Sequence, residues 1–448
     1  MNLFRSLGLF DAKVPRYTSY PPANRFEADV GARRQRGWLG EVRGDAPVSL
    51  YAHIPFCRRL CWFCACRTQG TKTLSPVAGY VKTLMSEIEA TARVLPRGVA
   101  ASRLHLGGGT PTLLSAEMMA TLLDSITGHF GRAEDYEFSV EIDPTEAAPA
   151  TLDCLARYGM DRASIGVQDF DDRVQKAIGR EQGFEVTQDV VAQLRTGGVQ
   201  SLNIDFLYGL PFQTAESLTR TIDQVASLRP DRLALYGYAH VPHVSKRQTM
   251  IPGEALPSAE ARFEMSQIAK DRLEALGYLP LGIDHFALPH DSLAKAAASG
   301  RMQRNFQGYT DDPCDTLIGF GASAISKFPQ GYAQNAVSTS AYVQRVEQGG
   351  LAAHKGLVLS DHDRFVARLI DMIMCDGRVS VARVLTDFPD HGEDLVQIIG
   401  RLMTLFAGAV AYDGDVLHLN DDMRPLTRLI AAQMDCTAQG AFVHSLAV

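Results

Sequence analysis

Short apolar stretches alternate with longer segments of helical periodicity between about residues 48 and 240. The short stretches read SLYAHIPF, RLHLGGG, YEFSVEID, RASIGVQDF, SLNIDFLYGLP and RLALYGYAH. The longer segments repeat apolar residues about every four positions, as in the sets Tyr80/Leu84/Ile88, Val186/Val190/Leu194 and Leu218/Ile222/Val225. Buried parallel strands and the amphipathic helices that cover them have these patterns. Six consecutive βα units predict an α/β fold, either a barrel or a doubly wound sheet.

The pattern changes beyond about residue 350. Helical periodicity from Arg364 to Met374 is followed by short apolar segments near VAYDGDVLHL, which predicts a mostly α-helical C-terminal domain at 351–448. The first 45 residues have too little apolar periodicity to form a domain of their own. We therefore expect residues 1–45 to be an extension that packs on the α/β domain at 46–350.

Polar residues and glycines gather where the predicted strands end. GGGTPT follows RLHL, and Glu141, Gln168, Asp205 and His240 lie at or near the ends of four later strands. Ligands bind at this edge in barrels and in open α/β sheets alike. Five such strand ends predict a single site.

Composition narrows the possible partners and compartment. The chain has 448 residues, 46% of them hydrophobic, and a formal net charge of −7 with dispersed Lys and Arg, so we expect no nucleic-acid partner. The N-terminal MNLFRSLGLFDAKVPRY is too short and too often interrupted by charge to be a signal peptide or a membrane span. We expect a cytoplasmic protein, in which clustered cysteines are more often ligands or catalytic groups than disulfides.

Four of the eight cysteines lie close together directly after the first predicted strand. Cys57, Cys61, Cys64 and Cys66 have the spacing CxxxCxxCxC, which differs from the paired knuckles of common zinc sites. Three thiolates in one loop favour an iron–sulfur cluster with one iron open to another ligand. A zinc site and a redox or structural role stay open as alternatives. Scattered as they are, the other four cysteines are expected to be small buried residues.

The cysteine loop resembles the signature of the radical S-adenosylmethionine enzymes, with Phe63 before the third cysteine. Further motifs, in order, resemble the oxygen-independent coproporphyrinogen III oxidase (dehydrogenase) family. They are PRYTSYP at residues 15–21, HIPFCxxxCxFCxC, GGGTPT, VEIDP, GVQDF, NIDxxYGLP, YAHVP and NFQGYT. The resemblance covers about residues 10 to 430 and implies a partial or complete (β/α) radical SAM barrel.

The resemblance implies a [4Fe–4S] cluster held by Cys57, Cys61 and Cys64, and S-adenosylmethionine, two molecules of it, as cofactor. Eleven residues would contact the two molecules. The first would meet Gly108 and Ile325, and Glu141 would accept hydrogen bonds from a ribose. The second would meet Gly109, Thr110, Gln168, Arg180, Asp205 and Ala239, while Tyr51 and Phe63 flank the cluster loop.

The substrate implied is coproporphyrinogen III, two of whose four propionates become vinyl groups to give protoporphyrinogen IX in haem biosynthesis. Cys66 would act in catalysis, and an unidentified electron donor and acceptor would serve a monomeric enzyme. Arginine suits carboxylates best. The candidate propionate partners are Arg16, Arg25, Arg59, Lys246, Arg247, Arg301 and Arg304.

Four positions depart from the family pattern: Pro22, Ala65, Arg67 and the segment MDCT at 434–437. Arg67 places a cation beside the cluster loop, where it could hold a propionate or displace the second S-adenosylmethionine. Two other functions remain open on the same scaffold, a haem-binding chaperone and a radical methyltransferase or cyclopropanase. Cys66 argues against the chaperone. A zinc-binding interaction protein is the simplest alternative.

Overall fold

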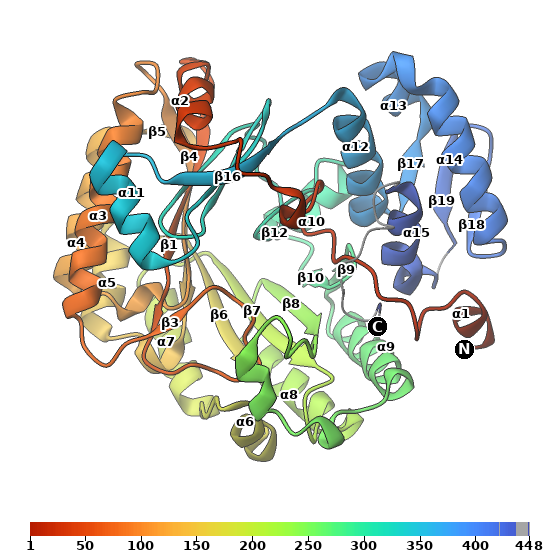
Figure 1. The fold of residues 1–448 in the computed structure, drawn as a ribbon. Coiled ribbons are helices and arrows are strands. Elements are labelled where there is room, and N and C mark those ends of the chain that lie inside the picture. The colour runs from red at the N-terminus through yellow and green to blue at the C-terminus, as the bar shows by residue number, and fades with distance from the viewer. Residues whose placement is uncertain (421, 436–446, 448) are drawn as a thin grey trace.

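The computed structural model describes residues 1–420, 422–435 and 447, and a twelve-stranded mixed sheet forms its centre (Figure 1). Its strand order is β16-β15-β14-β13-β1-β4-β5-β6-β7-β8-β10-β9. The six strands expected from the apolar stretches are adjacent and parallel, which confirms the predicted βα succession. They are β1 (Val48–Ile54), β4 (Ala100–Gly108), β5 (Gly131–Ile142), β6 (Arg162–Gln168), β7 (Ser201–Tyr208) and β8 (Arg232–Gly237).

Antiparallel strands extend the sheet on both sides. Next to β1 lies β13 (Leu317–Phe320), which is parallel to it, followed by β14 (Ile325–Phe328), β15 (Gly331–Asn335) and β16 (Ala353–Val358), each antiparallel to the strand before it. Next to β8 lie β10 (His285–Ala287) and β9 (Leu279–Leu281). Within the described residues the edge strands β16 and β9 do not pair, so the barrel is partial. The curved sheet remains open on the β8–β9 side (Figure 1).

Helices that follow the parallel strands cover the outer face of the sheet (Figure 1). They are α3 (Ser75–Ala92), α4 (Ala116–His129), α5 (Pro149–Arg157), α6 (Asp172–Ile178), α7 (Phe184–Thr196), α8 (Ala215–Ser227) and α9 (Ala259–Ala275). The sequence pattern was wrong at one position, Val186, which is 42% exposed. The buried stripe of α7 runs instead through Thr187, Val190, Val191 and Leu194.

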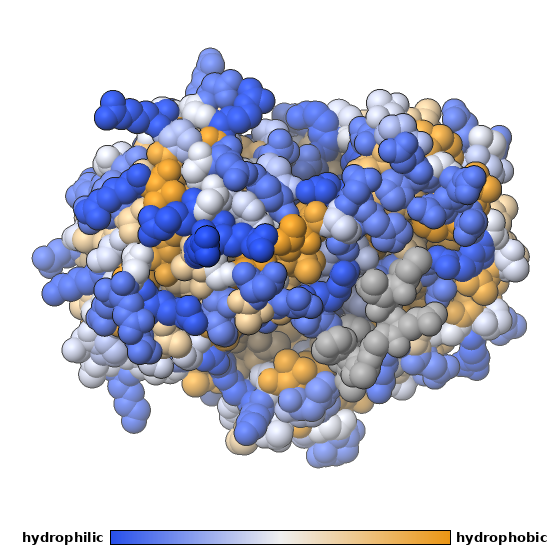
Figure 2. Space-filling model, turned by 45° about the horizontal axis from the view of Figure 1, so that its top comes forward, coloured by the Kyte–Doolittle hydropathy of each residue, from blue (hydrophilic) through white to orange (hydrophobic). Residues whose placement is uncertain are grey.

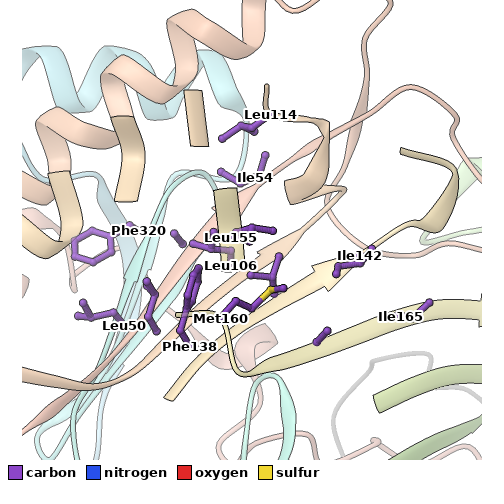
Figure 3. Close-up of a cluster of buried hydrophobic side chains, with 14 of the residues drawn as sticks. Leu50, Ile54, Leu106, Leu114, Phe138, Ile142, Leu155, Met160, Ile165 and Phe320 are labelled. Carbon is purple, nitrogen blue, oxygen red and sulfur yellow. The ribbon is translucent and has the colours of Figure 1, made fainter. Parts of the chain in front are cut away.

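A continuous apolar core lies between the sheet and these helices (Figure 3). Leu50 and Ile54 of β1, Leu106 of β4 and Phe138 of β5 point into it, and Leu155 of α5 meets them (Figure 3). All five side chains are at most 1% exposed. Burial of this apolar surface holds the strands in register and thereby fixes where their carboxyl ends lie.

Glu87 is a buried acidic group inside this core. Its carboxylate accepts hydrogen bonds from the Gly321 N–H (2.8 Å), the Asn335 side-chain amide (2.7 Å) and the Tyr342 hydroxyl (2.8 Å). These bonds tie α3 to the turn between β13 and β14, to β15 and to α11 (Thr339–Gly349). Burial nevertheless raises the pKa of Glu87 to about 7.

Glu87 makes folding stability depend on pH. Between a pKa of about 4.5 in the unfolded chain and about 7 in the fold, the native state holds a proton that the unfolded state has lost. The free energy of unfolding therefore decreases by about 3 kcal/mol as pH rises through this range, at 1.36 kcal/mol per pKa unit. Urea unfolding at several pH values should show a flatter profile for Glu87→Gln than for the unsubstituted protein. Parallel profiles would contradict this assignment.

The C-terminal region is mostly helical, as predicted. It contains α12 (Asp361–Asp376), α13 (Val381–Asp387), α14 (Gly392–Leu405) and α15 (Thr427–Met434) around a small sheet of β17 (Arg378–Ser380), β19 (Val416–Leu419) and β18 (Val410–Tyr412). The N-terminal residues contact both parts of the molecule. Phe4 and Phe10 pack in the C-terminal core, whereas Phe26 stacks on Tyr332 of β15 with ring centroids 5.7 Å apart.

The remaining elements connect these parts. They are α1 (Asn2–Ser6), α2 (Ala32–Gly40), β2 (Phe56–Cys57), β3 (Gln69–Gly70), α10 (Ser292–Ala298), β11 (Gln303–Asn305) and β12 (Gly308–Thr310). Hydrophilic residues dominate the face seen in Figure 2, with smaller hydrophobic patches between them. A bilayer-crossing helix needs about 20 apolar residues, and no helix in the described part of the chain meets this requirement.

Candidate active site

The cysteine loop leaves the carboxyl end of β1 and is closed at its base by two short strands. β2 and β3 pair in parallel, and the N–H groups of Gln69 and Thr71 donate to the carbonyls of Pro55 (2.7 Å) and Cys57 (2.9 Å). Residues 58–68 thus form a loop over the end of the sheet. Its last part is exposed at Ala65, Cys66 and Arg67.

Donors from distant segments reach the first two cysteines. The Thr110 hydroxyl lies 3.6 Å from the Cys57 sulfur, and the Arg180 guanidinium lies 3.6 Å from the Cys61 sulfur. The Ser245 hydroxyl donates to the backbone carbonyl of Cys64 at 2.9 Å. These donors stabilise a thiolate, although burial, the larger effect, raises the pKa of the Cys57 thiol to about 11.

The number of thiols in the loop bears on which metal group it could hold. A zinc ion about 2.3 Å from each sulfur draws its ligand atoms together. Among the described residues, the set of three such side chains with ligand atoms within 4.8 Å of one another is His362, His391 and Asp394. The loop cysteines, all of which the structure describes, form no set that compact. Three thiols in one loop suit an iron–sulfur cluster with one iron open to another ligand.

The glycine turn after β4 approaches the loop backbone closely. A Cβ on Gly109 would lie 2.6 Å from the Phe56 carbonyl oxygen and 2.9 Å from the Cys57 sulfur. The N–H of Gly109 donates to the Ile54 carbonyl at 2.7 Å, which holds the turn against β1. Gly108 has φ +123°, a conformation that L side chains rarely adopt. The turn thus exposes backbone polar groups beside Cys57, where an amino-acid moiety would bind.

Glu141 projects from β5 toward this turn. Its carboxylate accepts from the Gly108 N–H at 3.0 Å and contacts His105 Nε2 at 3.3 Å, while its side chain remains 42% exposed. Burial acts to raise the pKa of Glu141, but the hydrogen bond and charge of His105 and the Gly108 N–H together lower it. An ionised, accessible carboxylate at this position can accept hydrogen bonds from a ribose diol.

Arg180 links the cysteine loop to the ends of β5 and β6. It is 7% exposed, lies 3.1 Å from the Asp143 carboxylate and donates to the Gly166 carbonyl at 2.8 Å. Gln168 is adjacent, because a Cβ on Gly166 would lie 3.3 Å from the Gln168 amide and 3.2 Å from the Arg180 guanidinium. Gln168 has φ +74°, which turns the chain away from β6 at the site.

Asp205 lies beside Gly166 in the register of β6 and β7. Its carboxylate accepts from the Ser164 hydroxyl (2.9 Å) and the Asn203 amide (2.8 Å), and burial raises its pKa. On the adjacent strand, Ser164 pairs with Glu141. The structure thus places Glu141 and Asp205 along the same edge of the sheet.

The other predicted contacts lie on both sides of the loop. The Gln248 amide donates to the carbonyls of Phe63 (2.8 Å) and Ala239 (3.1 Å), which holds these two residues near each other. Ile325 lies across Gly319 from Tyr51, because Gly319 pairs with Tyr51 and a Cβ there would be 2.6 Å from the Ile325 carbonyl oxygen. The predicted site residues therefore surround one strand-end region.

Two departures from the family pattern, Arg67 and the MDCT segment, contact different parts of the structure. The Arg67 side chain donates from Nε to the Val337 carbonyl at 3.0 Å. Asp435 accepts hydrogen bonds from the hydroxyls of Tyr17 (3.3 Å) and Tyr20 (3.1 Å). Cys436 and Thr437 of the MDCT segment lie outside the described residues.

Sequence reasoning missed four residues of this region. His105 orients Glu141, Asp143 pairs with Arg180, and Gln248 holds Phe63. His53 contacts the Tyr51 hydroxyl from Nδ1 (2.9 Å) and the Arg67 carbonyl from Nε2 (3.1 Å). His53 and Asp143 belong to the motifs HIPFC and VEIDP, and His105 points to the same sheet face as Glu141. Their places in these motifs and on this sheet face are the sequence features from which these three residues could have been found.

Comparison with known proteins gives consistent matches. Residues 51–225 match the Radical SAM superfamily. The chain is 49% identical over 442 residues to an oxygen-independent coproporphyrinogen III oxidase of Paracoccus denitrificans (strain Pd 1222), covering 99% of this chain and 98% of the relative. It is 50% identical over 434 residues to a protein of the same name from Cereibacter sphaeroides (strain ATCC 17025 / ATH 2.4.3), covering 97% and 96%.

A solved structure extends the similarity to the whole fold. Coproporphyrinogen III oxidase (HemN) from Escherichia coli, described as a radical SAM enzyme, superposes with a TM-score of 0.90 at 35% sequence identity. The match covers 95% of this chain and 100% of that chain. The barrel, the C-terminal region and most of the N-terminal extension are thus shared with that protein.

Proposed function

The chain belongs to the oxygen-independent coproporphyrinogen III oxidase family of the radical SAM superfamily, and on this basis we propose that it converts two propionates of coproporphyrinogen III into vinyl groups. The product is protoporphyrinogen IX, an intermediate of haem biosynthesis. The observation that carries this proposal is the near-complete coverage of relatives with that name at 49% and 50% identity.

The cofactors are a [4Fe–4S] cluster and S-adenosylmethionine. When bound, with the cluster held by Cys57, Cys61 and Cys64, they would supply the radical chemistry that removes a hydrogen atom from a propionate Cβ. The substrate then loses CO₂ and transfers one electron to an acceptor, which leaves a vinyl group. Two such rounds convert both propionates into vinyl groups. The protein positions the reactants and excludes water around them.

Each residue of the site has a proposed part in this positioning. Cys57, Cys61 and Cys64 hold the cluster, the turn at Gly108 binds the methionine end of one S-adenosylmethionine, and Glu141 accepts from its ribose. A second molecule would lie near Arg180 and Asp205. The ionised Glu141 carboxylate and the donors around the cysteines support this arrangement. The remaining contacts are proposed as in the family pattern, at Tyr51, Phe63, Gly109, Thr110, Gln168, Ala239 and Ile325.

We infer that the enzyme is a cytoplasmic monomer. An unidentified donor provides its electrons, and an unidentified acceptor takes electrons from the substrate. Each round would take one electron from the donor and pass one electron to the acceptor. The decisive experiment is an anaerobic assay of reconstituted protein with S-adenosylmethionine, reductant and coproporphyrinogen III. Protoporphyrinogen IX appearing with 5′-deoxyadenosine and methionine supports the proposal. S-Adenosylhomocysteine as product, or stoichiometric haem binding with no vinyl product, would favour the methyltransferase or the chaperone instead.

Cys66 is expected to act after cluster assembly. Its exposed thiol follows Cys64 by two residues and lies at the open end of the loop. Cys66→Ala should keep iron and sulfide content and still cleave S-adenosylmethionine. Vinyl formation should fall by roughly 10²-fold or more, the range for a positioned proton-transfer group. Cys66→Ser tests whether a hydroxyl suffices, and wild-type vinyl yield in Cys66→Ala would refute the role.

A further inference from the structure

A cavity of about 620 Å³ lies where the open side of the barrel meets the N-terminal segment and the C-terminal region. Its volume falls within the roughly 300–1,000 Å³ of small-molecule sites. All three parts of the chain contribute to its wall. The barrel contributes Tyr208, Tyr236 and Gly237 at the ends of β7 and β8. The N-terminal segment contributes Arg16 and Thr18, and the C-terminal region contributes Asp376 and Arg428.

Four arginines line this cavity: Arg424 is exposed at its rim, and Arg16, Arg304 and Arg428 come from distant parts of the sequence to its inner wall. Arg16 donates to the Gly237 carbonyl at 2.6 Å. The Arg304 guanidinium lies 4.3 Å from the centre of the Tyr309 ring, and its Nε and Nη1 have no hydrogen-bond partner among the described residues. Arg428 is 8% exposed and donates to backbone carbonyls of both termini.

Positive charge exceeds negative charge on the inner wall. In the described part of the chain, Arg16 and Arg304 form no ion pair with a carboxylate. Asp284, whose carboxylate feels the charges of both arginines, already contacts His285 Nδ1 at 2.7 Å. Burial, together with the like charges of Arg16 and of nearby Arg262, lowers the pKa of Arg428 to about 10.

Acidic groups elsewhere on the wall do not compensate this charge. Glu274 is paired with Lys270 at 3.6 Å. Asp376 faces the charges of Arg378, Arg383 and Arg368. Asp422 is exposed at the rim, as is Arg424. Asp284 faces Arg16, Arg304 and Arg428, and three cations beside one carboxylate favour an anionic ligand.

The cavity adjoins the predicted radical site. Tyr236 lines the cavity and packs against the same buried cluster as Phe63, which directly precedes Cys64. The register of β7 and β8 pairs Asp205 with Ala234 and Leu207 with Tyr236, so Asp205 lies on the same sheet face as Tyr236. A ligand that fills the cavity therefore extends toward the ends of β7 and β8, where the site residues lie.

We propose that Arg304, together with Arg16, binds the carboxylates of the two propionates that are not converted and thereby directs the other two toward the barrel, while the buried charge of Arg428 adds to the positive potential beside them. This inference rests on the proposed function, which supplies a macrocycle with four carboxylates. Of the seven cations named from the sequence, Arg16 and Arg304 line the cavity. Among the others, Arg25 pairs with Asp363 at 3.2 Å and Arg247 donates to Thr68. The three arginines are positioning residues.

Arg304→Gln tests the proposal against a matched control, Arg301→Gln. Arg301 is exposed, lies outside the cavity wall and donates to the Ser299 hydroxyl at 3.0 Å. Removing one charged hydrogen-bond partner of a carboxylate should raise KM for coproporphyrinogen III roughly 10- to 100-fold in Arg304→Gln. Arg301→Gln should leave this KM unchanged. Arg304→Lys should recover part of the loss, because it keeps the charge and loses the bidentate geometry.

Binding of coproporphyrin III, the oxidised tetracarboxylate, separates this proposal from the proposed function. The unsubstituted protein and Arg301→Gln should bind coproporphyrin III more tightly than its tetramethyl ester, and Arg304→Gln should lose that preference. Equal KM and equal binding in Arg304→Gln and the unsubstituted protein would overturn the inference, even if vinyl groups form. Preference for the acid that depends on Arg304 without any vinyl product would support the inference while the proposed function fails.

Discussion

Replacing Cys57, Cys61 or Cys64 with alanine is expected to abolish the iron–sulfur cluster and, with it, all cleavage of S-adenosylmethionine. Each variant removes one of three thiolates, and two are insufficient to retain a cluster with one open iron. Thr110 and Arg180 additionally donate hydrogen bonds to Cys57 and Cys61. An alanine at either position cannot accept that hydrogen bond. Iron and sulfide content after anaerobic reconstitution, and 5′-deoxyadenosine yield, measure the effect.

Cys314→Ala is the matched control for these variants. Cys314 is a partly buried free cysteine that contacts the Ser102 hydroxyl at 2.9 Å, away from the loop. This variant should keep the full iron content and the wild-type rate. A full cluster in Cys57→Ala, Cys61→Ala or Cys64→Ala would show that the ligand assignment is wrong at that position.

Gly109→Ala is expected to disrupt the same site without touching a ligand. The added methyl would lie 2.6 Å from the Phe56 carbonyl oxygen and 2.9 Å from the Cys57 sulfur. Neither group can easily withdraw, because β2 is paired with β3 and the Gly109 N–H is bonded to Ile54. Overpacking of this kind costs about 1–3 kcal/mol. We expect reduced cluster content and at least roughly tenfold slower S-adenosylmethionine cleavage.

Gly128→Ala provides the comparison for Gly109→Ala. Gly128 lies in α4, and a methyl added there would have no neighbouring atom within 4 Å outside the backbone of its own helix. Alanine is favoured over glycine in a helix by up to about 1 kcal/mol, so this variant should be as stable as the unsubstituted protein or more so. Thermal unfolding of both variants separates a local effect on the site from loss of the fold. Wild-type iron content and rate in Gly109→Ala would argue against close packing at the turn.

Local patterns predicted much of the fold and of the site. The six parallel strands were predictable because each has a short run of apolar residues that faces the core and is followed by a helix of matching periodicity. The cysteines and the glycine turn were predictable because their members are neighbours in the sequence, and the family assignment from these motifs is confirmed by the comparisons. Val186 was misplaced because a single apolar residue near the start of a helix does not define which side faces the core.

The parallel strands, the three-thiol loop and the family could all be inferred without coordinates, since each is encoded by residues at short, regular spacing. Which charges act together became apparent only in three dimensions. Arg180 reaches Cys61 from 119 positions away, and Arg16 meets Arg304 and Arg428 in one cavity. A paired and an unpaired arginine look identical in a sequence, because the difference lies in which chain segments pack beside them. That packing depends on how the open side of the barrel meets the two ends of the chain.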